Sequence, residues 1–563
     1  MSTINVHPRP GGHHRPGWRP LAGLRRALII REALAGVTLL AIAVPLNIGY
    51  AQIAGLPPTA GLYALVLPAF AYALVVSSRQ VVASPDAAAA ALVASSIGGL
   101  AVAGGSGYAT MALAQAIICG VLLVAAAVFK LGFLANFLSK PILIGFVGGL
   151  ALDIMVSQLA KMLGIPLKSG EEFLGKLSQL SAGLGKTNPW SLLIAVASVA
   201  ILLLGRRIAQ VVPWALVVLI FTTVLVVTAG LETSGVAVLG PVDAGPPVLT
   251  WPVLDLAGWL VLVPSAIALT LVTMAEGLLV ARSYGEKNGY PTSPNRDLLA
   301  FGAANIAAGA SGSFTVGSST SRTAAMDQAG SRTQLPTLVA AAGTLLLLLF
   351  GTALLEHIPS PAIGAVVAVA ILPLLGIREF RVLWRQDQFE FIVGAVCFLA
   401  TLLIGAIPGI LIAFVLALVN LAKRAATPAV DVLAAEGDPL AAVVRIAPPG
   451  TATAPGVLLI RVAAPLFFAN SSAVAETIRD HIEAIVDPLV RYLVLDLEAV
   501  TDVDVTAAET FISLQHWLNE RHITLSFSRA RPGLEDRMRA LGIITDEAVY
   551  PTNRAALDAA AER

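Results

Sequence analysis

Residues 81–91 read VVASPDAAAAA and residues 313–323 read SFTVGSSTSRT, and these two stretches decide how the rest of the chain is interpreted. In the first, Ser84 and Pro85 suit the N-cap and first turn of a helix that runs into the alanines. In the second, several hydroxyl side chains precede a short helix that carries Arg322. A helix that begins this way leaves backbone N–H groups unpaired at its N-terminus, so each stretch favours negative charge nearby.

The chain around these stretches is too apolar for a protein dissolved in water. Of its 563 residues, 57% are hydrophobic and only 13% are charged, against about 25% charged in ordinary soluble domains. Three charge-free stretches, 33–78, 87–129 and 391–422, are each long enough for two membrane-spanning helices. Single spans are predicted at 142–153, 190–205, 211–230, 256–276 and onward, 298–312, 333–355 and 358–377. With the short segment 318–329, the predicted total is about fourteen.

The placement of basic residues predicts that both ends of the chain lie in the cytosol. Lys and Arg gather in short cytoplasmic loops, and a count that starts inside leaves Glu232 and Glu356 on the outer side. One outer loop breaks this pattern with mixed charge: Lys161, Lys168, Glu171, Glu172 and Lys176. We therefore predict a multi-pass protein of the cell membrane, with a cytosolic tail at 1–30 and a transport domain at 31–424. The net charge of +1 gives no reason to expect nucleic acid as a partner.

The last part of the chain has the periodicity of a water-soluble α/β domain. A linker is predicted at 425–453 and the domain at 454–563. Strands and helices alternate there, which is typical of a small α/β sheet. Strands are predicted at 457–462, 492–497 and 523–527, and helices at 471–485, 506–521 and 535–541.

The two opening stretches occupy corresponding places in two halves of the membrane region. Broken helices in such positions are typical of transporters built from inverted repeats, with the substrate at the repeat interface near the middle of the bilayer. Two helix N-termini together with Arg322 would favour an anion. The alternative is that each stretch is only a Gly/Ser-rich surface for helix packing.

Glu276, like Arg322, is an ionisable residue whose burial in a membrane span costs free energy. It follows a long charge-free run, and an ionisable side chain inside a span is a functional hypothesis by default. We expect it to take up and release a proton that is coupled to transport. The alternative is that Glu276 lies at the cytoplasmic end of its helix and pairs with Arg282.

The chain resembles the SulP anion permeases, a family of sulfate permeases and solute carrier 26-like proteins. The resemblance runs through Ala43-Val44-Pro45, the segments 51–58 and 61–63, Ser77-Ser78-Arg79, Met274-Ala275-Glu276-Gly277 and 312–335. The C-terminal part resembles a STAS domain, the domain shared by sulfate transporters and anti-sigma-factor antagonists, at Asp496-Leu497 and at 503–506.

This resemblance implies a membrane all-α fold of seven plus seven helices in an inverted repeat, divided into core and gate domains, with an α/β STAS domain. It also implies an elevator-like movement of the core and a homodimer. The implied substrate-binding residues are Gln52, Tyr63, Ser84, Pro85, Asp86, Ser318, Ser319, Thr320, Ser321 and Arg322. Glu276 is implied to handle the coupling ion, with Thr320 as a further candidate should that ion be a cation such as Na⁺.

The sequence departs from the family pattern at three places. Asp86 puts an acid near the expected anion site. Val280 stands where sodium-coupled bicarbonate members have a threonine, which favours H⁺ over Na⁺ as the coupling ion. Thr506 matches the position that is phosphorylated in anti-sigma-factor antagonists, but Ala507 follows it in place of glycine, so we expect Thr506 to act as a helix N-cap more readily than as a regulatory site.

We therefore expect a transporter of a small inorganic anion, with sulfate first, bicarbonate second and a C4-dicarboxylate as a further possibility. A nucleobase permease fits the membrane region, but the C-terminal domain argues against it. A membrane sensor that binds an anion without moving it, and signals through the STAS domain, is the alternative of another class. We expect neither an enzyme nor a cofactor or metal, because no phosphate loop, nucleophile elbow or His/Cys cluster occurs.

Overall fold

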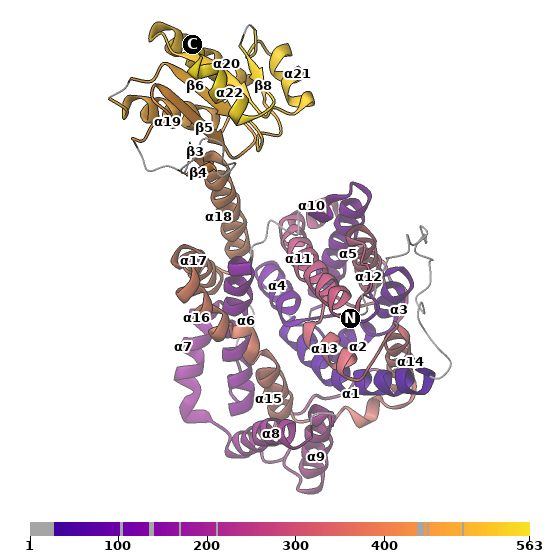
Figure 1. Cartoon of the computed structure of the whole chain (residues 1–563). Coiled ribbons are helices and arrows are strands. Elements are labelled where there is room, and N and C mark those ends of the chain that lie inside the picture. Colours follow the sequence, from indigo (N-terminus) through magenta and orange to yellow (C-terminus); the bar gives the residue numbers. More distant parts are fainter. Residues whose placement is uncertain are drawn as a thin grey trace, which may run out of the picture. The chain divides into compact units, whose positions relative to one another are not determined.

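The computed structural model describes residues 28–101, 105–133, 140–167, 171–209, 212–435, 444–446, 450–486, 489–545 and 547–562. Nearly all of the predicted N-terminal tail, together with Lys168, lies outside these residues. The chain divides into two compact units, Met1–Ala417 and Leu418–Arg563. We call them the helical unit and the C-terminal unit (Figure 1).

The helical unit contains two successive series of helices, each interrupted by one very short strand. The first series is α1 (Ile29–Ile53), α2 (Pro58–Tyr63), α3 (Leu67–Val75), β1 (Ala83–Ser84), α4 (Ala87–Ile97), α5 (Ser106–Val128), α6 (Lys140–Leu163), α7 (Phe173–Gly183), α8 (Pro189–Ile208) and α9 (Trp214–Thr228). The second is α10 (Leu256–Val261), α11 (Val263–Asn288), α12 (Pro294–Ala310), β2 (Gly317–Ser318), α13 (Thr320–Gln328), α14 (Leu335–Phe350), α15 (Ser360–Ile371), α16 (Ile377–Gln386), α17 (Gln388–Leu403) and α18 (Ala406–Ala426), which belongs to the C-terminal unit from Leu418 on.

Many helices of this unit are shorter than a full membrane span. By length and composition alone, six helices of the described residues could cross a membrane, or up to seven if the bent pair Phe173–Lys186 and Pro189–Gly205 is one span. Further apolar helices are shorter, among them α4, α9, α14 and α17. The larger total predicted from the sequence counts these short and broken segments as spans. Of these, α4 is largely buried among its neighbours, whereas α9 and α17 expose many apolar side chains.

The helices pack into two bundles, which form the core and gate of the seven-plus-seven fold. In the first bundle, α12 packs along α5 and α3, α1 packs along α14, and α11 packs along α5. In the second, α6 packs along α17 and α15, and α15 continues onto α8. Figure 1 shows α6 to α9 and α15 to α17 on one side and α1 to α5 and α10 to α14 on the other. We call the first bundle the core and the second bundle the gate.

Glycines let α5 and α12 approach each other closely in the core. A Cβ added at Gly302 of α12 would lie 2.7 Å from Val124 Cγ2 and 2.9 Å from the carbonyl oxygen of Gly120. A Cβ added at Gly120 of α5 would lie 2.7 Å from Ile306. Small residues at such crossings are how membrane helices gain packing contacts when no hydrophobic driving force exists between them.

Two buried carboxylates hold the loops that flank the half-helices. Asp297 at the start of α12 accepts hydrogen bonds from the backbone N–H of Ser77 at 2.8 Å and of Ser78 at 3.3 Å, just before β1. Glu32 in α1 accepts from the backbone N–H of Arg332 at 2.5 Å and from Thr333 Oγ1 at 2.9 Å, just after α13. Bonds to a charged acceptor are the stronger ones, so these loops are well fixed.

The C-terminal unit is built on one six-stranded sheet with the strand order β4-β3-β5-β6-β7-β8. Strands β5 to β8 are parallel, whereas β3 and β4 are antiparallel additions at one edge. The strands are β3 (Val430–Ala435), β4 (Val444–Ile446), β5 (Val457–Val462), β6 (Tyr492–Asp496), β7 (Thr524–Ser528) and β8 (Val549–Tyr550), and the helices are α19 (Ser471–Glu483), α20 (Val505–Glu520), α21 (Pro532–Ala540) and α22 (Asn553–Ala561). The α/β fold class is confirmed, and the stretch predicted as a linker, 425–453, contributes β3 and β4 to the sheet.

Substituting a single glycine tests the packing of α5 on α12. We expect Gly120→Ala to lower the free energy of unfolding by about 1–3 kcal/mol, because overpacking outweighs the helix-favouring effect of alanine. Gly107→Ala in the same helix is the matched control, because nothing lies within 4 Å of its added Cβ. The unfolding temperature of the purified protein in detergent should fall for the first variant and hold or rise for the second. Equal temperatures would contradict the close approach.

Candidate functional site

The two half-helices predicted from the sequence meet at a two-stranded antiparallel pair. Ala83 of β1 lies opposite Ser318 of β2, and Ser84 lies opposite Gly317. The pair is extended by Ser319, whose backbone N–H donates to the carbonyl oxygen of Val82 at 3.0 Å. Since each strand leads directly into a helix, the N-termini of α4 and α13 are brought to one place.

Each of these N-termini is capped by a side chain of the sequence around it. Asp86 Oδ1 accepts from the backbone N–H of Ala89 at 2.7 Å and is the N-cap of α4. Ser319 is the N-cap of α13. The prediction that Ser84 is the N-cap and Pro85 the first turn is wrong, because β1 uses Ser84 for strand pairing and the helix begins later, at Ala87.

Arg322 joins these segments to α1. Its side chain is only 1% exposed, and its Nε donates to Ser319 Oγ at 2.8 Å. Its Nη1 donates to Asn47 Oδ1 and its Nη2 to the carbonyl oxygen of Pro85. The guanidinium also lies 5.7 Å from the ring centre of Tyr50. These contacts use three of the five N–H groups of an arginine, and two remain for a ligand.

The groups that accept hydrogen bonds from the Arg322 side chain carry no charge. All its hydrogen-bond acceptors are neutral oxygens, and within the described ranges it forms no ion pair. Asp86 lies close enough to interact electrostatically, although the two groups form no salt bridge. A buried cation without a paired carboxylate favours a bound anion.

Three buried hydroxyl groups near this point have no hydrogen-bond partner: Ser84 Oγ, Thr315 Oγ1 and Ser318 Oγ. A buried polar group without a partner is uncommon and calls for an explanation, such as a ligand or water. The other predicted hydroxyl residues of this segment, Thr320 and Ser321, are exposed at the first turn of α13. Hydroxyls are suitable donors to an oxyanion.

Glu276 lies on α11, beside the two half-helices. Thr273, one turn before it, approaches Gly317 of β2, and the Glu276 carboxyl interacts electrostatically with Asp86. The alternative that Glu276 pairs with Arg282 is wrong, because Arg282 Nε donates instead to Glu286 at 2.8 Å. Glu276 is therefore an acid that faces the candidate site and not a member of a surface ion pair.

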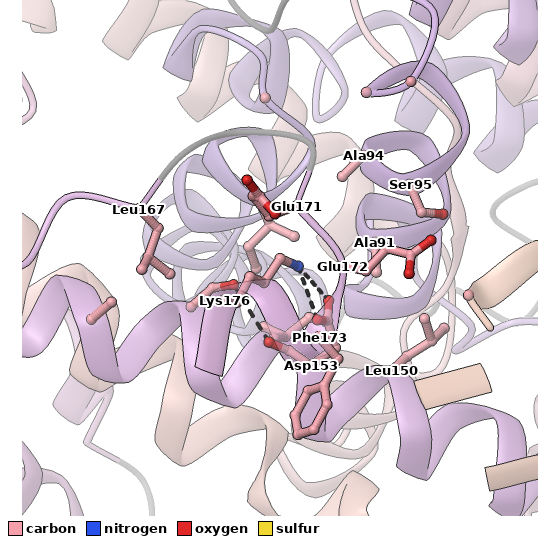
Figure 2. Close-up of a pocket in the computed structure, with 18 of the residues that line it drawn as sticks. Ala91, Ala94, Ser95, Leu150, Asp153, Leu167, Glu171, Glu172, Phe173 and Lys176 are labelled. Atoms are coloured by element: carbon pink, nitrogen blue, oxygen red, sulfur yellow. Dashed lines mark hydrogen bonds and ion pairs between the residues drawn. The ribbon is translucent and has the colours of Figure 1, made fainter. Parts of the chain in front are cut away.

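A cavity of about 820 Å³ lies between the core helices α1 and α4 and the gate helices α6 and α17. Gln52 lines it and accepts a hydrogen bond from Lys161 Nζ at 2.9 Å. Figure 2 shows Ala91, Ala94 and Ser95 of α4 in this cavity, together with Asp153 of α6. Tyr63 is not among the lining residues and lies instead beside Gly312.

Sequence reasoning missed Asn47, which is the residue of α1 that meets Arg322. Its Nδ2 also donates to the carbonyl oxygen of Gly61 at 3.1 Å, so its amide is fixed at both ends. The signal that the sequence offered was an amide side chain within a largely apolar stretch. Two other acids of the helical unit form ion pairs: Asp153 pairs with Lys176 at 2.7 Å, and Asp327 pairs with Lys287 at 2.6 Å.

The amino-acid sequence matches two family models. Residues 29–397 match the model described as the sulfate permease family, and residues 449–556 match the STAS domain. The chain belongs to the sulfate permease family. This is a family of transporters and not of enzymes, and the helical unit of this permease is a multi-pass membrane region.

Named relatives of this permease include sulfate transporters. A probable sulfate transporter of Mycobacterium tuberculosis is 32% identical over 536 residues, which cover 94% of this chain and 95% of the relative. The sulfate transporter 3.1 of Arabidopsis thaliana is 26% identical over 91% of this chain and 81% of its own length.

Solved structures show the same fold at low sequence identity. The murine solute carrier 26 family member A9 anion transporter, in an inward-facing state, is 20% identical with a TM-score of 0.87, covering 97% of this chain and 93% of that one. The transmembrane domain of the cyanobacterial bicarbonate transporter BicA is 21% identical with a TM-score of 0.60, covering 69% of this chain and 98% of that one. These likenesses confirm the predicted fold class of the permease.

Thr506 in the STAS domain is not the helix cap that the sequence suggested. The N-cap of α20 is Asp504, whose Oδ1 accepts from the backbone N–H of Ala507 at 2.8 Å. Thr506 is the second residue of the helix and is exposed. The regulatory role of Thr506 stays a prediction.

Removing the charge of Asp86 tests the electrostatics of the permease site. We expect Asp86→Asn to raise the affinity for sulfate about tenfold, because asparagine keeps the cap while an unfavourable negative charge is lost. Asp255→Asn is the matched control, since Asp255 caps α10 through Gly258 in the same way but far along the chain. Equilibrium binding of labelled sulfate to the purified protein measures both. An unchanged affinity would mean that this carboxyl is already neutral when the anion binds.

Proposed function

We propose that this permease is a secondary active transporter of a small inorganic oxyanion, with sulfate as the first candidate. One observation carries the proposal: the strand pair β1–β2 brings two helix N-termini together beside the buried guanidinium of Arg322. Partial positive charge from helix ends, free N–H donors and a cation with unused donors are all suited to an oxyanion.

Sulfate is favoured over bicarbonate by the pattern of similarity. The relatives named as sulfate transporters cover nearly the whole chain, at identities up to 32%. The likeness to a bicarbonate transporter is 21% identical and supports the fold alone. Bicarbonate and a C4-dicarboxylate therefore rank behind sulfate in a panel of substrates.

Protons are the proposed coupling ion, and Glu276 is the proposed carrier. Its carboxyl makes no ion pair within the described segments and lies near Asp86. Two neighbouring acids repel each other when both are charged, which favours the uptake of one proton. Sodium is disfavoured, because Val280 of α11 supplies no hydroxyl ligand one turn after Glu276.

The proposed movement is an elevator-like displacement of the core against the gate. Both half-helices and Arg322 belong to the core, whereas α6 belongs to the gate, so the site would travel with the core. Lys161 of α6 and Gln52 of α1 join the two bundles, and this bond would have to break during each cycle. A homodimer in the cell membrane, with both termini in the cytosol, belongs to the same proposal.

Proteoliposomes with independently varied pH and sodium gradients test transport and coupling together. We expect an acidic exterior to drive labelled sulfate uptake by the wild type, and Glu276→Gln to keep sulfate exchange while losing the response to the pH gradient. Glu286→Gln is the control, because Glu286 is exposed and pairs with Arg282 on the same helix.

Arg322→Gln should reduce sulfate flux at least tenfold in the same vesicles, because the anion loses its full positive charge. Proton coupling is wrong if no anion flux of the wild type responds to the pH gradient. Anion binding without flux would support a non-transporting sensor instead.

A further inference from the structure

Lys161 is a partly buried cation that the proposed transport site does not use. It lies on α6 of the gate, two residues before the helix ends. Its Nζ donates to the neutral oxygen Gln52 Oε1 at 2.9 Å, and in the described part of the chain it forms no ion pair. A lysine inside a membrane segment without a counter-ion is costly and marks an ion pathway by default.

Gln158 lies one turn before Lys161 on α6 and lines the same cavity. Its side chain is 0% exposed, yet neither its Nε2 nor its Oε1 has a hydrogen-bond partner. A buried polar group without a hydrogen-bond partner destabilises the folded protein. An amide N–H next to an ammonium is the donor pair that an oxyanion accepts. The unpartnered amide is therefore independent evidence for a ligand beside Lys161.

The other charges of the cavity do not neutralise Lys161. Lys176 Nζ donates to both carboxylate oxygens of Asp153, at 2.9 and 2.7 Å, so that pair is internally balanced (Figure 2). Glu171 and Glu172 also line the cavity but form no ion pair with Lys161 within the described ranges. Lys161 is therefore the cation of this cavity that lacks an acidic partner.

We propose that Lys161 and Gln158 form a second anion-binding site in the wall of the 820 Å³ cavity, separate from the half-helix site. Its ligand is a small oxyanion, and the choice of sulfate as the ligand rests on the proposed function. An ammonium has three N–H groups, so Lys161 can hold the anion and Gln52 together.

The position of Gln52 connects the two sites along one helix. Gln52 and Asn47 are five residues apart on α1, which is about 7.5 Å of helix. Asn47 is bonded to Arg322 at the half-helix site, while Gln52 is bonded to Lys161. The second site therefore collects an anion at the cavity and releases it toward Arg322. This gives a role to Lys161, one of the basic residues that departed from the predicted charge pattern.

Equilibrium binding of labelled sulfate to the full-length protein in lipid nanodiscs tests the second site. In an Arg322→Gln background, which weakens the half-helix site, we expect binding to remain and to weaken as NaCl is raised. Adding Lys161→Gln should lower the remaining affinity at least tenfold, whereas Lys161→Arg should keep it within about threefold. In the wild type, two binding components are expected, and Lys161→Gln removes one.

Lys186→Gln is the matched control, because it removes the same charge from an exposed position just after α7. If Lys161→Gln does not fold, Gln158→Leu tests the site through its other residue. We expect this variant to weaken sulfate binding as well. The proposal is overturned if the Arg322→Gln protein binds no sulfate, or if Lys161→Gln and Lys186→Gln weaken binding equally. Wild-type sulfate flux in proteoliposomes separates the second-site proposal from the proposed transport function. Sulfate binding that depends on Lys161, without any flux, would refute only the transport function.

Discussion

The burial of the Arg322 guanidinium is the constraint on which the centre of the helical unit depends. A cation enclosed between membrane helices must be surrounded by hydrogen-bond acceptors, because its loss of hydration is not otherwise offset. The acceptors come from three separate segments: Asn47 of α1, the carbonyl oxygen of Pro85 and the hydroxyl of Ser319. The strand pair β1–β2 holds two of these segments in register. The buried carboxylates of Asp297 and Glu32 then fix the loops beyond them.

Under the proposed function, the balance of charge at this centre would connect anion binding to proton binding. Arg322 contributes one positive charge, and two helix N-termini together contribute about one more. Asp86 and Glu276 offset both when each is ionised, so the site is then close to neutral. A single proton on this pair leaves a net positive site, to which an oxyanion is attracted. Under the proposed function, a coupling ion and its cargo therefore help each other to bind without touching.

Under the proposed function, the division into core and gate would let this charge be exposed and covered again. The core carries the half-helices, and its helices α5 and α12 pack closely. The contact between Lys161 and Gln52 spans the two bundles at the cavity. A single hydrogen bond contributes about 0.5–1.5 kcal/mol, so it can bias the position of the core without locking it.

Patterns that are local in sequence determined the class of protein and the outline of both units. Long apolar runs require a bilayer, a helix start within such a run requires compensation inside the protein, and alternating strands and helices require a sheet. The segments around Ser84 and Ser318, the membrane arginine Arg322, and strands β5 to β7 could therefore be found without coordinates. Short elements with few residues, such as β4 and β8, lack enough periodicity to be recognised.

Only the tertiary structure decided which residues meet. Asn47 and Arg322 are 275 positions apart, and Gln52 and Lys161 are 109 apart, so no local pattern could pair them. The same reason accounts for the cap of α4: Ser84 is a good N-cap by itself, but its pairing with β2 moves the helix start to Ala87 and leaves the cap to Asp86. The sequence determined the kinds of charge in the membrane, and the fold decided which of them lie beside the two half-helices.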